Sequence, residues 1–157
     1  MPAHADAHAP PPTRTDAELL ERFRNTSNRP RSSQTLGFEV LRIDQAAMEV
    51  EVAFVGSPEF CNPMGQIQGG FLTAMLDECM AVAGVVASGV SASIASLEIK
   101  TSYMRPAMPG RLRGVGRVAK WGRSVAFLEG ELYGEDGKLV ARASSTAMPI
   151  PFKKSEG

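Results

Sequence analysis

Residues 62–77 decide the fold, and they read Asn62-Pro-Met-Gly-Gln-Ile-Gln68-Gly69-Gly70-Phe-Leu-Thr73-Ala-Met-Leu-Asp77. A Gly-Gly turn opens a segment, 69–88, that is apolar nearly all round and rich in alanine and glycine. A helix of this composition has to be enclosed by other elements. We therefore predict one long central helix whose only charged residues are Asp77 and Glu78.

The segments on either side of this helix alternate with the period of β-strands. Before it, apolar residues alternate with glutamates over 48–54, after a strand around 38–43, which predicts a hairpin. After it, turn residues separate four strands that we expect to form an antiparallel meander, over 93–104, 111–120, 124–133 and 139–148. The order predicts an α+β fold, with an antiparallel sheet wrapped around one long helix.

The chain is expected to hold one domain, over residues 15–150, because 157 residues suffice to bury a sizeable core. Residues 1–14 are rich in Ala, Pro and His and are predicted to be a disordered leader, and 151–157 a tail. Thr15 and Glu18 have the spacing of a capping box. This spacing predicts a short N-terminal helix that ends near residues 28–30.

Composition excludes several classes of partner and compartment. Seventeen basic residues balance seventeen acidic ones, so no net field draws in nucleic acid or an anionic membrane. Two cysteines, Cys61 and Cys79, make no disulfide framework. No secretory signal or uninterrupted transmembrane stretch is present, so we expect a cytoplasmic protein without membrane or nucleic-acid partners.

The positions of the histidines exclude the most reaction classes, because the only two, His4 and His8, lie in the expected leader. A Ser-His-Asp or Cys-His nucleophile therefore has no base, and a zinc or iron site lacks its usual imidazole ligands. No metal or redox cofactor is expected. A carboxylate is left for acid-base work, and Asp77 is the best placed because it lies within the apolar helix.

Asp77 also has plainer interpretations: it faces solvent, or it bonds to Thr73 four residues earlier. Glu78 lies about 100° further round the helix, so both carboxylates cannot face one pocket. We expect Glu78 to face solvent or an interface.

The Gln68-Gly69-Gly70 turn leads straight into the helix, where first-turn amides and the helix dipole favour a partially negative oxygen. Such a donor could polarise a thioester carbonyl, unless the glycines merely make a tight loop. Gly69 and Asp77 are eight residues apart, so ~12 Å separates them along the helix. One carbonyl cannot touch both, whereas a two-fold dimer with antiparallel helices would bring Gly69 of one chain near Asp77 of the other.

Seven basic residues and no acidic one lie between 100 and 128, whereas 33–99 holds eight acidic residues and one basic one. Arg111, Arg113 and Arg117 share one strand face, and Lys120 and Arg123 flank a turn. Such a surface could hold phosphates. The alternatives are a solvated sheet face, or pairing with the acidic region across a subunit contact.

These residues together resemble the hot-dog-fold acyl-CoA thioesterases, in particular the phenylacetate-degradation type and its 4-hydroxybenzoyl-CoA thioesterase relatives. The resemblance covers about 37–148. Its most specific parts are the 62–77 stretch, Ser96-Leu-Glu, Tyr103-Met-Arg-Pro-Ala and Asp136-Gly-Lys-Leu-Val-Ala. It implies hydrolysis of an acyl- or aryl-CoA to the free acid and coenzyme A by a homodimer or dimer of dimers.

The resemblance also implies roles for individual residues. Asp77 would activate water or attack the carbonyl, Gly69 would polarise it, and Asn62 would position the thioester or water. Ser96 would hold the nucleophilic water, and Gln68 replaces the family's usual histidine. Substrate-binding residues are expected beside the helix start and, for the coenzyme A phosphates, at the basic turn: Gly70, Thr73 and Met64, and Lys120, Arg123 and Ser124. A non-catalytic acyl-CoA sensor, or an interaction protein using the basic face, are the alternatives.

Overall fold

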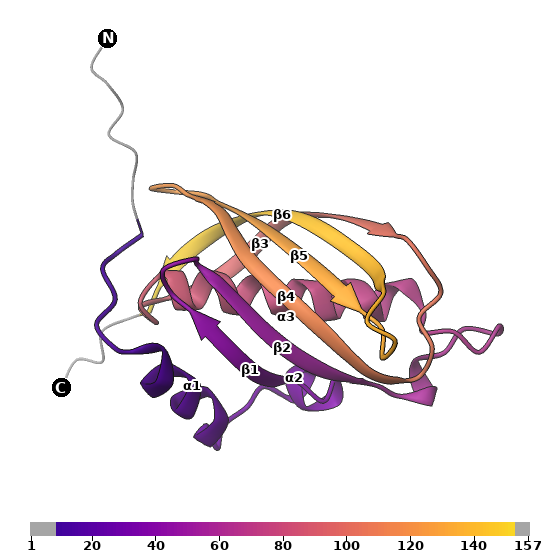
Figure 1. Ribbon diagram of the computed structural model, residues 1–157. Helices are drawn as coiled ribbons and strands as arrows, with labels where there is room; N and C mark the ends of the chain where they lie inside the picture. The colour runs from indigo at the N-terminus through magenta and orange to yellow at the C-terminus, as the bar shows by residue number, and fades with distance from the viewer. Residues whose placement is uncertain (1–8, 153–157) are drawn as a thin grey trace, which may run out of the picture.

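The computed structural model describes residues 9–152, and a long helix lies across a curved sheet (Figure 1). The elements in chain order are α1 (Asp16–Asn25), α2 (Arg31–Thr35), β1 (Glu39–Asp44), β2 (Glu49–Gly56), a 3-10 turn η1 (Pro58–Phe60), α3 (Gly69–Ala87), β3 (Ala92–Tyr103), β4 (Gly110–Trp121), β5 (Ala126–Tyr133) and β6 (Leu139–Pro151). The α+β fold with a sheet around one central helix is confirmed.

The N-terminal helix begins at the predicted capping box. Thr15 is the N-cap of α1, and its hydroxyl accepts from the Glu18 amide while the Glu18 carboxylate accepts from the Thr15 amide. Leu19 is buried and fixes α1 against the sheet. The helix ends earlier than predicted, at Asn25, and the short helix α2 that follows was not predicted because its sequence, RSSQT, has no apolar periodicity.

The strand order is β1-β2-β4-β5-β6-β3, with every neighbouring pair antiparallel. The predicted hairpin of β1 and β2 is confirmed. The predicted four-strand meander is wrong for β3, which pairs with β6 at the far edge, while β4 pairs with β2 and β5. The reason is the 19-residue helix α3, which is about 28 Å long and carries the chain across the sheet before β3 begins.

Helix α3 lies unusually close to the centre of the sheet. A Cβ atom at Gly114 would overlap the Cys79 sulfur, and one at Gly116 would overlap the Cys79 backbone. Gly130, which pairs with Gly116 on the next strand, lies close to α3 without overlap, since a Cβ atom there would be 3.1 Å from the Met80 side chain. Three glycines on β4 and β5 therefore let the helix backbone reach the sheet, and Cys79 and Met80 are fully buried.

Within the described residues, α3 is the one helix long and apolar enough to cross a membrane, with a mean hydropathy of 1.6. Ten of its 19 residues are buried inside the fold, so its apolar character is explained by its place in the core. Of the expected leader, residues 1–8 lie outside the described part, and 9–14 contain no helix or strand. Of the expected tail, 153–157 lie outside it, and Pro151 is the last residue of β6.

Candidate active site

The start of α3 is held from outside the helix. The Gln68 amide donates to the Phe60 carbonyl at 2.9 Å, and the Ile67 amide donates to Ala107 at 2.8 Å. The rings of Phe60 and Phe71 stack with their centroids 4.2 Å apart, which ties η1 to the first turn. The loop before the helix therefore enters at a fixed angle.

The first-turn amides of α3 have no side-chain cap. Gln68 occupies the N-cap position with an extended backbone, but its side chain is exposed and makes no capping hydrogen bond. Gly69 and Gly70 follow as the first two helical residues. The amides of a first turn have no acceptor within the helix, so this end can receive a partially negative oxygen from a ligand.

An open hollow of about 510 Å³ lies at this end of the helix. It is lined by the end of the 62–67 loop, the first turn of α3 and the segment that follows β3, namely Gln66, Ile67, Gly69, Leu72, Tyr103, Met104, Arg105, Pro106 and Ala107. Asp77 is not among the residues that line it. Within one chain, Gly69 therefore lines this hollow and Asp77 does not.

Asp77 and Ser96 are brought together. The Ser96 hydroxyl on β3 donates to Asp77 Oδ1 at 2.6 Å, and the carboxylate is half-buried. The plainer interpretation that Thr73 bonds to Asp77 is not what the structure has. The Thr73 hydroxyl instead donates to Thr101 at 3.1 Å and lies 2.7 Å from the Tyr103 hydroxyl.

Glu78 points to another side of α3, as the 100° step predicts. Its carboxylate is half-buried and accepts a 2.7 Å hydrogen bond from Ser33, so it has a partner within the chain and does not face open solvent, while a position at an interface stays a prediction. Ser33 lies on α2 and is itself only 3% exposed. The unpredicted helix α2 therefore supplies the partner, and Glu78 ties it to the central helix.

Asn62 organises the loop that precedes α3. Its side-chain oxygen accepts hydrogen bonds from the backbone amides of Met64 at 2.9 Å and Gln66 at 3.2 Å. The backbone amide of Asn62 donates to the Gln66 carbonyl at 2.7 Å. Met64 stands in this loop with 77% of its surface exposed, and its role in an acyl pocket stays a prediction. The loop projects beyond the end of the sheet (Figure 1).

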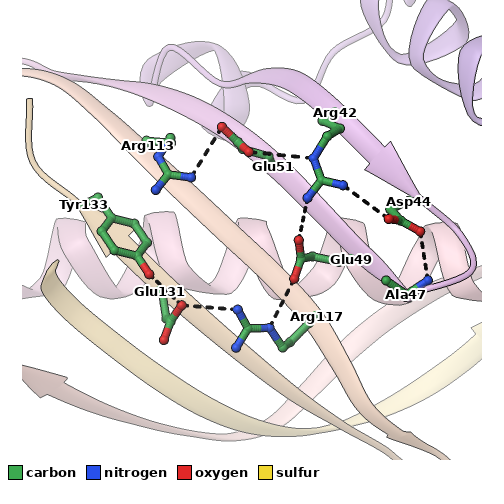
Figure 2. A network of polar contacts seen from close by, with 9 residues as sticks. All are labelled: Arg42, Asp44, Ala47, Glu49, Glu51, Arg113, Arg117, Glu131 and Tyr133. Carbon is green, nitrogen blue, oxygen red and sulfur yellow. Dashed lines mark hydrogen bonds and ion pairs between the residues drawn. The ribbon is translucent and has the colours of Figure 1, made fainter. Parts of the chain in front are cut away.

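The arginines of β4 are engaged in ion pairs on the outer face of the sheet, and Figure 2 shows Arg113 and Arg117 among them. Arg111 pairs with Glu39 at 3.2 Å, and Arg113 pairs with Glu51 at 3.4 Å. Arg117 pairs with Glu49 on β2 and with Glu129 and Glu131 on β5. The three arginines therefore pair with acidic residues of β1 and β2 in the same chain, whereas the alternative had placed this pairing across a subunit contact.

Tyr133 belongs to the same outer network. Its hydroxyl donates to Glu131 at 2.8 Å, and the Arg113 guanidinium lies 4.5 Å from the centre of its ring. Burial, together with the hydrogen bond to the Glu131 carboxylate, raises the pKa of Tyr133. This network stabilises the outer face and lies on the opposite side of the sheet from α3.

Lys120, Arg123 and Ser124 lie at the turn between β4 and β5, at the end of the sheet opposite the start of α3 (Figure 1). Strand β4 has 12 residues and spans about 40 Å. The structure therefore does not bring this turn to the Gly69 of its own chain. Within residues 9–152, no three His, Cys, Asp or Glu side chains gather into a set that could hold a metal ion.

Tyr103, the first residue of the Tyr103-Met-Arg-Pro-Ala motif, lies beside the start of α3 and has no role in the sequence-based prediction. Tyr103, at the end of β3, donates its hydroxyl to the Gly69 carbonyl at 3.0 Å. A β-bulge between Ser96 and Glu98 changes the alternation of β3, so Ser96, Thr101 and Tyr103 all reach α3. Strict alternation would place Ser96 opposite the other two, and no local signal in the sequence marks the bulge.

Comparisons with known proteins agree with this architecture. The family model for the thioesterase superfamily matches residues 64–141. A phenylacetic acid degradation-related protein from Ralstonia eutropha JMP134, assigned as a thioesterase, is 39% identical over 84% of this chain and 97% of its own, with a TM-score of 0.76. A variant of the phenylacetic acid degradation protein PaaI from Thermus thermophilus is 27% identical over 77% of this chain and 100% of its own, with a TM-score of 0.67.

A curated relative is the 1,4-dihydroxy-2-naphthoyl-CoA hydrolase of Escherichia coli (strain K12), 27% identical over 85 residues. The match covers 54% of this chain and spans 62% of that enzyme's length. The family model's range of 64–141 holds the start of α3, the Asp77–Ser96 pair and the first strands after the helix. With its sheet wrapped around α3, the chain has the hot-dog fold and belongs to the thioesterase superfamily.

Proposed function

We propose that this protein hydrolyses an acyl- or aryl-CoA thioester to the free acid and coenzyme A. The observation that carries the proposal is the 2.6 Å hydrogen bond between Ser96 and Asp77 on the open side of α3. A carboxylate that accepts a hydrogen bond from a hydroxyl is held in one orientation, which suits a general base or a nucleophile. As a base Asp77 takes a proton from the water that attacks the thioester carbonyl carbon, and as a nucleophile its own carboxylate oxygen attacks that carbon.

The uncapped start of α3 is the proposed site of carbonyl polarisation. As the attacking oxygen adds, negative charge develops on the carbonyl oxygen, and the Gly69 amide donates to it. One preorganised donor of this kind lowers the barrier by about 3 to 4 kcal/mol. When water attacks, collapse of the tetrahedral species breaks the C–S bond and leaves the free acid, and the expelled coenzyme A thiolate takes the proton that Asp77 removed from the water. When Asp77 attacks, collapse expels the thiolate and leaves a mixed anhydride, which a water then hydrolyses to the free acid and the regenerated carboxylate.

The second subunit is part of this proposal. Gly69 and Asp77 belong to one helix, ~12 Å apart, and only Gly69 lines the hollow at the helix start. Strand β3 is an edge of the sheet. Helix α3 lies beside this edge, and two of its small residues, Ala74 and Ala81, have exposed or half-buried side chains. A two-fold contact there would set the two α3 helices side by side and antiparallel, and form two composite sites.

The same two-fold arrangement accounts for the basic turn. In an antiparallel pair, the end of the sheet that carries Lys120, Arg123 and Ser124 in one subunit lies toward the Gly69 end of its partner. These residues are proposed to reach the coenzyme A phosphates from the second subunit. Gly70 and Thr73 stay proposed contacts at the helix start, and Met64 at the loop tip would reach an acyl group only across such a contact. A pairing of two dimers is proposed as the larger assembly.

Asn62 keeps a narrower proposed role. Its side-chain oxygen is occupied by loop amides, so only its NH2 group is left to contact the thioester or the attacking water. Gln68 has an exposed side chain beside Gly69. It is proposed to contact the substrate carbonyl region where the family usually has histidine.

The test is release of free thiol from a panel of short, long and aromatic CoA thioesters. Turnover that Asp77→Asn abolishes, without loss of folding or assembly, supports the hydrolase. Binding of acyl-CoA without any thiol release favours the alternative, a non-catalytic sensor, for which Gln68 in place of histidine is the motivating observation. Full activity of Asp77→Asn would refute the assigned role of the carboxylate.

A further inference from the structure

Tyr103 is fixed by the sheet at the point where β3 ends. It pairs with Ala141 of β6, and the next two amides, of Met104 and Arg105, donate to the Val140 carbonyl at 2.8 and 3.2 Å. The side chain is 53% exposed, so burial does not explain its position. Its contacts with the start of α3 do.

The Tyr103 ring lies directly against Gly69. A Cβ atom built on Gly69 would come within 2.9 Å of the ring carbon Cζ and 3.0 Å of the hydroxyl oxygen. Gly69 has no positive φ, so its backbone does not require glycine. At Gly70 the nearest atom to a Cβ would be the Gln68 side-chain oxygen at 3.9 Å. An alanine at the first glycine would therefore have to displace the Tyr103 ring from the start of α3, whereas one at the second would meet no close atom.

The Tyr103 hydroxyl also holds the peptide of the first turn. It donates to the Gly69 carbonyl at 3.0 Å, and the Thr73 hydroxyl lies 2.7 Å from the Tyr103 oxygen. Thr73 in turn bonds to Thr101 on β3. The Gly69 carbonyl shares its peptide plane with the Gly70 amide, and a hydrogen bond on the carbonyl polarises that N–H.

We propose that Tyr103 is a positioning residue that fixes the direction of the Gly69 and Gly70 amides. The ring blocks one side of the turn, the hydroxyl sets the tilt of the Gly69 peptide, and no side chain caps the helix in their place. The inference rests on the proposed function in one respect, that these amides polarise the thioester carbonyl. A donor aimed at the developing oxyanion acts on the transition state, so its misalignment lowers kcat more than it raises KM.

The experiment compares Tyr103→Phe with Tyr133→Phe, which removes the other tyrosine hydroxyl of the chain, on the outer face of the sheet. Each variant is assayed for thioester hydrolysis, and its glycine amides are followed by NMR with ¹⁵N-glycine labelling. For Tyr103→Phe we expect kcat to fall roughly 3- to 10-fold with KM nearly unchanged, the size of one neutral hydrogen bond. The Gly69 and Gly70 resonances should move and their amide exchange should quicken.

Tyr133→Phe should change none of these quantities. Unchanged kcat in Tyr103→Phe, an effect confined to KM, or unmoved Gly69 and Gly70 resonances would each overturn the positioning role. The two readouts separate the two proposals. If the wild-type protein hydrolyses no thioester, the proposed function fails, and the amide resonances still decide whether Tyr103 holds the turn.

Discussion

Subunit complementation gives the sharpest test of a shared site. Asp77→Asn removes the carboxylate, and Gly69→Ala disturbs the amide turn because the new methyl would meet the Tyr103 ring. A general base contributes about 10²- to 10⁴-fold to the rate, so Asp77→Asn should lose at least that much. Asp77→Asn alone should therefore be nearly inactive, and Gly69→Ala, if the donor is displaced from the oxyanion, should lose up to the roughly 10²- to 10³-fold that one such donor supplies.

The expected recovery follows from the two-fold geometry. In a mixed dimer, the Gly69 of the Asp77→Asn subunit meets the Asp77 of the Gly69→Ala subunit, so one of the two sites is intact and the other is doubly defective. A heterodimer isolated with two affinity tags should show about half of wild-type activity. An equal, fully exchanged mixture should show about one quarter, because about half of its dimers are mixed.

The assay is thiol release by the tandem-purified heterodimer, with its subunit ratio checked by mass. If each site were built within one subunit, neither subunit of the heterodimer would hold both groups, and activity would stay at the level of the parents. That outcome, in a heterodimer shown to be intact, would refute the composite site and the argument from the ~12 Å helical separation behind it.

Three further outcomes are expected. Ser96→Ala should lower kcat about tenfold, because Asp77 loses a charge-assisted hydrogen bond. The hydroxyl of Ser93 bonds the Ile150 carbonyl instead, so the matched change Ser93→Ala should leave kcat unaltered. Equal effects of the two changes would contradict the role assigned to Ser96. Gly116→Ala should reduce the free energy of unfolding by about 1 to 3 kcal/mol or more, because its methyl overlaps the Cys79 backbone, whereas Gly70→Ala should not; urea unfolding measures both. Folding raises the pKa of Tyr133, so its contribution to stability is complete below the ordinary tyrosine pKa of about 10 and is lost as pH rises through the folded value. The free energy of unfolding of the wild type should therefore fall more above about pH 10 than that of Tyr133→Phe. Parallel curves of unfolding free energy against pH would contradict this prediction.

The ion pairs on the outer face of the sheet could be predicted only in part from the distribution of charge along the sequence. The separation of acidic residues in 33–99 from basic ones in 100–128 is visible in the chain. Which pairs form depends on register: Glu49 stands opposite Arg117, and Glu51 stands within reach of Arg113, because β2 pairs with β4. Had β3 been the neighbour of β4, as the predicted meander had it, these arginines would have met different partners.

Much of the fold and part of the candidate site could be predicted from local pattern alone. Helical rise makes the separation of Gly69 and Asp77 a property of sequence spacing, and strand alternation identifies which residues face inward. The bulge in β3 has no such local signal, so the convergence of Ser96, Thr101 and Tyr103 on one helix face could not be predicted. The short helix α2 could not be predicted either, because Ser33 is held by a hydrogen bond to the distant Glu78 and not by residues near it in the chain.

The sequence by itself determined a glycine-opened apolar helix, a carboxylate eight residues along it, and the strands around them, because each depends on interactions between residues close in the chain. Only the tertiary structure decided the strand order, the Ser96–Asp77 pair, the burial of Glu78 and the contact of Tyr103 with Gly69. These join residues 19 to 45 positions apart, where periodicity specifies which face a side chain occupies but not which partner lies across from it.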